Sequence, residues 1–89
     1  METADRIAEP TTAQNMVALL LKMAGPDLER QEKALCEGLT RTQAGVKGLQ
    51  EQRLAYVERG AEQAWQNQYD LKTALVAEIT RVLAERFGR

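Results

Sequence analysis

The chain has 89 residues, a formal net charge of −1 and hydrophobic residues at 44% of its positions, so it makes at most one domain with a modest core. It contains one cysteine and no histidine, which excludes an internal disulfide and removes the commonest general base and transition-metal ligand. The 12 basic and 13 acidic residues are mixed along the chain, whereas nucleic-acid binders carry a basic stripe.

The start of the chain has mixed charge and lacks the hydrophobic run of a signal peptide. We therefore expect residues 1–10 to form a flexible tail and residues 11–89 to form a single helical domain. The longest apolar run, residues 16–24, is interrupted by Lys22 and is far shorter than the roughly 20 residues of a membrane span. These features predict a cytoplasmic protein without a membrane partner.

A short helix is predicted directly after the tail. Thr11 and Gln14 have the spacing of a capping box, in which each side chain bonds the other residue's backbone N–H. Gly25 followed by Pro26 predicts the end of this helix, since glycine adopts the left-handed conformation easily and proline cannot continue the hydrogen-bond ladder. Asp27 is then placed to cap a second helix.

The stretch 27–87 is expected to be helical throughout, because it contains no proline and is rich in Ala, Leu, Glu, Gln, Lys and Arg. A stripe that includes Ala64, Gln68 and Leu71 repeats about every 3.6 residues along this stretch, which is the helical period. The sequence therefore predicts an all-α fold, with a short N-terminal helix followed by a long helical segment.

Four glycines decide where the long segment breaks. We expect a break within 38–48 that folds it into an antiparallel helical hairpin or small bundle. Gly38 could end one helix and a capping box at 40–43 could start the next; residues 45–48 offer another turn. Gly60 has no capping residue beside it and is interpreted as a helical glycine or a bend. The alternative is one unbroken helix that pairs as a long coiled coil.

No set of residues suited to catalysis is present in the sequence. The chain lacks serine as well as histidine, and a di-metal carboxylate site of the helical type requires histidines. Cys36 is interpreted as a small buried hydrophobic residue. We expect no enzyme activity, no cofactor, no metal site and no small-molecule substrate.

The first helix carries more apolar surface than one neighbour can cover. Its large apolar residues, Leu19 among them, span an arc of roughly 200° at 100° per residue, whereas packing on one helix needs little over 100°. The helix is therefore expected either to lie between two helices of its own bundle or dimer, or to dock onto a partner. An aromatic pair four residues apart, Trp65 and Tyr69, is interpreted either as an anchor in the chain's own core, with the indole N–H at its edge, or as an interface hot spot. The candidate partner-binding residues are therefore Met16, Val17, Leu20, Leu21, Met23, Trp65 and Tyr69.

These observations predict a small helical interaction protein that binds another protein, itself or both, with a homodimer expected. An adaptor, an inhibitor or anti-activator, and a secretion-type chaperone all fit this description. The alternative is a homo-oligomeric coiled coil that acts as a structural or assembly factor without a separate target. Nucleic-acid binding is a remote alternative that would need arginines brought together only by the fold.

Overall fold

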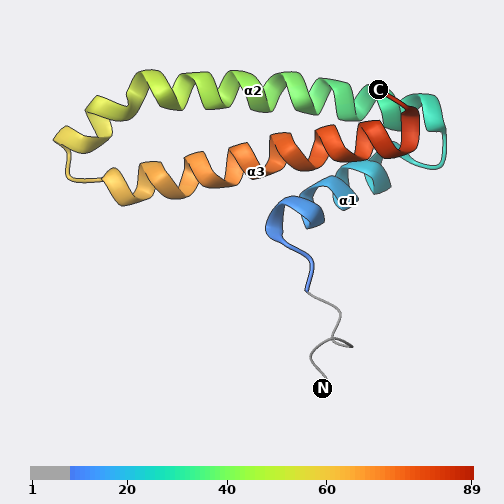
Figure 1. The fold of residues 1–89 in the computed structure, drawn as a ribbon, viewed down its shortest axis with the longest axis horizontal. Helices are drawn as coiled ribbons and strands as arrows, with labels where there is room; N and C mark the ends of the chain where they lie inside the picture. The colour runs from blue at the N-terminus through green and yellow to red at the C-terminus, as the bar shows by residue number, and fades with distance from the viewer. Residues whose placement is uncertain (1–8) are drawn as a thin grey trace.

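A computed structural model describes residues 9–89 and contains three helices over that range. They are α1 (Thr12–Ala24), α2 (Leu28–Glu58) and α3 (Glu62–Phe87). The two long helices form an antiparallel hairpin, and α1 packs against both of them at the end opposite the α2–α3 turn (Figure 1). The predicted all-α fold is confirmed. Most of the predicted tail, residues 1–10, lies outside the described residues.

The predicted signals around α1 are confirmed. The Thr11 hydroxyl accepts a hydrogen bond from the Gln14 backbone N–H at 3.1 Å, and the Thr11 N–H donates to the Gln14 side-chain oxygen at 2.9 Å. Gly25 ends the helix with φ of +84°. The Asp27 carboxylate accepts from the Glu29 N–H at 2.9 Å. These local contacts fix where α1 ends and α2 begins.

The predicted break within 38–48 is wrong, because α2 continues through this region without interruption. Gly38 is buried, and a Cβ atom added to it would lie 3.2 Å from Leu20 Cδ2 of α1 and 3.7 Å from Ile79 Cδ1 of α3. The glycine thus allows three helices to approach closely instead of ending one. The hydroxyl of Thr42 donates to the Gly38 carbonyl oxygen inside the helix, at 2.7 Å.

The chain reverses at Gly60, where φ is +73°. The Ala61 N–H donates to the Tyr56 carbonyl oxygen at 2.8 Å and the Gly60 N–H donates to the Val57 carbonyl oxygen at 3.0 Å. These two bonds form a Schellman motif, which satisfies the last carbonyl groups of a helix with backbone donors alone. Because no capping side chain takes part, the turn leaves little trace in the sequence besides the glycine.

The core lies at the three-helix end of the molecule. Its buried members are Val17, Leu35, Ile79, Val82 and Leu83. At 1.5 Å per residue, the 13 residues of α1 span about 20 Å and the 31 residues of α2 span about 46 Å. α1 therefore covers less than half of the hairpin, and the remainder is a pair of helices without a third neighbour among the described residues.

The predicted stripe is out of phase in the first half of α3, where Ala64, Gln68 and Leu71 are exposed. The residues of α3 that are buried or half-buried at heptad spacing are Trp65, Tyr69, Lys72, Val76, Ile79 and Leu83. Of the described helices, only α2 packs against this half of α3, so one narrow row of residues is covered, and that row lies one position away from the predicted stripe. Where α1 also packs against α3, the covered surface is wider. Farther along α3, Leu75 and Val82 are covered as predicted.

Two glycine substitutions test this account of the turn. Gly60→Ala is expected to lower the free energy of unfolding by about 1 kcal/mol, because alanine is strained at positive φ. Gly48→Ala is expected to raise it by up to about 1 kcal/mol, because Gly48 is helical and a Cβ atom there meets nothing within 4 Å. Urea unfolding followed by circular dichroism measures both. Equal effects of the two substitutions would contradict the assignment of the turn.

Candidate functional site

Helix α1 has one face in the core and a second apolar face in solvent. Ala13 and Val17 are buried, and Leu20 packs against the core cluster. The exposed fractions of Met16, Leu19 and Met23 are 41%, 57% and 72%. These three residues lie within an arc of roughly 60° at 100° per residue, and we call them the α1 stripe. Side chains of this size are usually covered, so the stripe is a candidate contact surface.

The structure divides the predicted partner-binding residues of α1 into two groups. Val17 is buried, and Leu20 and Leu21 pack against the same core; they hold α1 on the hairpin. Met16 and Met23 face solvent. Leu19 completes the exposed stripe, although it was absent from the predicted set. Leu19 lies three residues after Met16 and four before Met23, and this spacing places all three on the same side of a helix. The sequence therefore contained the information needed to include Leu19.

The aromatic pair predicted as a hot spot anchors the hairpin internally. The Trp65 indole N–H donates to the carbonyl oxygen of Leu49 at 2.6 Å, and the tryptophan ring is buried. The half-buried Tyr69 ring stacks on it with centroids 4.9 Å apart. The Arg53 guanidinium lies 5.3 Å from the centre of the indole, as in a cation–π contact. Trp65 thus ties α3 to α2 beyond the reach of α1.

Trp65→Phe is expected to lower the free energy of unfolding by about 1–3 kcal/mol, because it removes both the hydrogen bond to Leu49 and part of the buried ring. Tyr69→Phe keeps the stacked ring and should change stability by less than about 0.5 kcal/mol. Chemical unfolding followed by far-ultraviolet circular dichroism measures both variants. A Trp65→Phe protein as stable as the parent would exclude the anchoring role.

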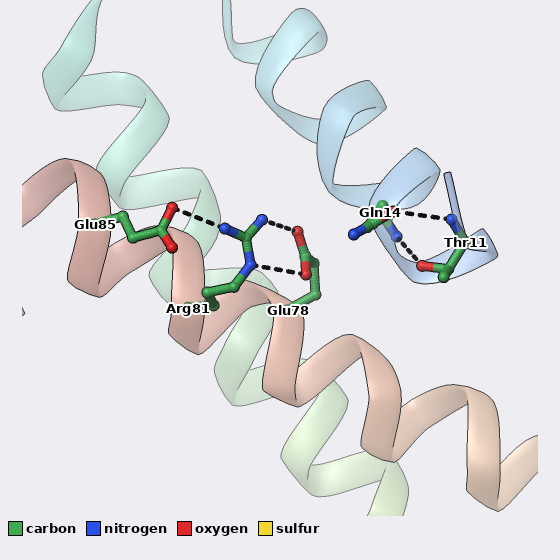
Figure 2. Close-up of polar contacts among 5 residues, drawn as sticks. All are labelled: Thr11, Gln14, Glu78, Arg81 and Glu85. Atoms are coloured by element: carbon green, nitrogen blue, oxygen red, sulfur yellow. Dashed lines mark hydrogen bonds and ion pairs between the residues drawn. The ribbon is translucent and has the colours of Figure 1, made fainter. Parts of the chain in front are cut away.

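A charged cluster lies on α3 near the beginning of α1. The Arg81 guanidinium donates hydrogen bonds to the Glu78 carboxylate through Nε and Nη2. Its Nη1 donates to the Glu85 carboxylate at 2.7 Å. Figure 2 draws this cluster on α3 together with the capping box of Thr11 and Gln14 at the start of α1. The hydrogen bond from Arg81 lowers the pKa of Glu78 below its usual value of 4.5, and partial burial opposes this effect.

The lowered pKa of Glu78 predicts a specific acid sensitivity. The folded state binds the proton more weakly than the unfolded chain, so this contribution to stability is present above pH 4.5 and is lost as the pH falls. Glu78→Gln and Arg81→Gln should therefore each reduce the loss of stability between pH 6 and pH 3. Unfolding curves across this range measure the effect. Variants that lose stability as steeply as the parent would show that the pair contributes nothing.

Within 9–89, no group of three or more His, Cys, Asp or Glu side chains is arranged to hold a metal ion. Cys36, predicted to be buried, is half-buried: it packs against the core, and its sulfur lies 3.2 Å from Arg89 Nη1. The same nitrogen of Arg89 pairs with Glu32 at 2.9 Å. This contact ties residue 89 to α2.

Comparison of the chain with protein-family models, with curated proteins and with solved structures gave no match. In the part of the chain that the structure covers, none of the helices has the length and apolar character needed to cross a membrane. Three of the seven large apolar side chains that are exposed in the described part of the chain belong to the α1 stripe, on a helix whose other face lies in the core.

Proposed function

We propose that the protein acts by binding another protein through the α1 stripe of Met16, Leu19 and Met23. The observation that carries this proposal is the exposure of all three side chains on one side of a helix that is already docked. Their removal from water would favour association, since burying an exposed side chain of this size contributes roughly 1.5–3 kcal/mol. The residues that hold α1 in place would remain within the chain's own core.

The chemistry of the stripe defines the kind of partner. Lys22 is the one charged residue among positions 12–24, so the stripe suits an apolar groove or an apolar helix face more than a charged surface. Methionine side chains repack easily around different shapes, which suits two of the three stripe positions. The protein would act by occupancy, as an adaptor, an inhibitor or anti-activator, or a secretion-type chaperone does.

Because α1 is anchored by Val17 and Leu20, the stripe is presented by a helix that is already formed. Binding then requires less ordering of the backbone than the folding of a free peptide would. The partner would add a further layer of packing to the three-helix end, where the core of this small chain is concentrated.

The proposal is tested with the double variant Leu19→Lys/Met23→Lys and the control Ala18→Lys, which changes an exposed residue elsewhere on α1. A protein captured from the native lysate by the parent and the control should be lost by the double variant. Calorimetry with that purified partner should show an affinity at least about 30-fold lower, the effect of losing roughly 2 kcal/mol at a hot spot.

Circular dichroism must show equal helix content in all three proteins, which separates lost contact from lost folding. If the parent captures no protein, or if the double variant binds the partner as tightly as the control does, the α1 stripe is not the binding surface. Loss of binding by the control alone would assign the contact to the side of α1 that carries Ala18.

A further inference from the structure

We infer that the hairpin side facing away from α1 packs against the same side of a second copy of the chain, giving a homodimer with a four-helix core. This inference concerns a surface other than the α1 stripe and does not rest on the proposed function. It begins from a groove between α2 and α3 that no residue of α1 lines.

The groove has an apolar floor, and its edges carry threonine, glutamine and, near the chain termini, Arg89. One hollow of about 180 Å³ is lined by Gln43 and Val46 of α2 and by Thr73 and Val76 of α3. A second hollow of about 360 Å³ continues toward the chain termini, where Thr80 lines it and Arg89, paired with Glu32, closes it. We call this surface the α2/α3 groove.

The α2/α3 groove lies on the side of α2 that faces away from α1. Gly38 marks the direction of α1, since a Cβ atom there would touch Leu20. Gln43 follows five residues later, which places it roughly 140° around the helix from Gly38. Leu54 comes three helical turns after Gln43 and therefore points the same way; its exposed fraction is 68%. The groove thus continues into an exposed leucine near the α2–α3 turn.

The size of this side is sufficient for a dimer. Between Cys36 and Val57 it runs for 21 residues, or about 30 Å, and two helices are together about 20 Å wide. The projected area is therefore on the order of 600 Å², and the accessible area is larger because side chains corrugate it. Stable interfaces bury about 800 Å² per partner. A partner consisting of one helix would cover only part of this width, whereas a second hairpin would cover all of it.

The few charges on this side favour a second copy as the occupant. Between Cys36 and Val57 of α2, and between Gln63 and Phe87 of α3, the helical repeat places two charged residues here, Lys47 on α2 and Asp70 on α3. Both are exposed. Arg89 also lines the groove and is paired with Glu32, and Glu62, just after the α2–α3 turn, is paired with Arg53. Charges of both signs are therefore mixed on this side, without the one-signed patch that would select an oppositely charged partner.

The contacts that set the register of the hairpin place these two charges at the same level. Leu49 lies beside Trp65, and Gly45 lies beside Lys72, so Lys47 and Asp70 stand opposite each other across the groove. A twofold axis parallel to the hairpin exchanges the two edges, and Lys47 of each copy then meets Asp70 of the other. The α2 helix of one copy packs antiparallel to α3 of the next, as in four-helix bundles.

Light scattering coupled to size-exclusion chromatography on the full chain tests the inference, with an expected mass twice that of one chain at 100 µM. Leu54→Lys should weaken the dimer by about tenfold or more, since it places a charge in the interface. Leu19→Lys, a change of the same kind in the α1 stripe, should leave the dimer intact. Both leucines are exposed in the monomer, so the two changes have similar effects on folding.

A charge exchange tests the orientation. Lys47→Asp and Asp70→Lys should each weaken the dimer several-fold, because each puts like charges together at two symmetric places. The double variant Lys47→Asp/Asp70→Lys should restore the parental affinity. A monomer at 100 µM, a dimer weakened by Leu19→Lys and not by Leu54→Lys, or a double variant weaker than both single variants would each overturn the inference. None of these results bears on whether the α1 stripe binds another protein.

Discussion

The length of α1 relative to the hairpin is the constraint on which the rest of the structure depends. α1 spans about 20 Å and α2 about 46 Å, so the short helix can complete a three-helix core at one end only. Leu35 and Ile79, the most deeply buried large side chains, lie at that end. Both exposed surfaces follow from this mismatch: α1 has one free side because it sits at the edge of the core, and the hairpin has a free groove because it lacks a further helix.

Features fixed by local backbone chemistry could be predicted from the sequence. Thr11 with Gln14, Gly25 and Asp27 were each assigned correctly, since their hydrogen bonds join residues within a few positions of one another. The helical character of 27–87 follows from composition and from the absence of proline. In these cases the residues that indicate the structure are the same few residues that form it.

Features that depend on which helix lies next to which could not be predicted. The residues around Gly38 resemble a helix end. In the folded protein, however, the missing side chain of Gly38 makes room for Leu20 of α1, and this contact forms only when α1 packs on α2. Gly60 offers no capping side chain, and its Schellman bonds use the backbone alone. In α1, the apolar arc could be recognised; its division into a buried part with Val17 and an exposed part with Leu19 depends on where α2 and α3 lie.

The glycines of α2 also connect stability to association. A helical glycine costs about 1 kcal/mol relative to alanine, and tertiary packing offsets this at Gly38, where Leu20 and Ile79 fit closely, and at Gly45, where the Lys72 side chain lies against the helix. Gly48 has no such neighbour within the described part of the chain. Within the chain, the distal hairpin therefore depends on the contacts of Trp65 with α2. A partner present at 100 times its dissociation constant adds about 2.7 kcal/mol to the stability of the folded state, which exceeds the cost of two such glycines. If a second molecule packs on the hairpin as proposed, its contribution to stability is therefore as large as the cost of these glycines.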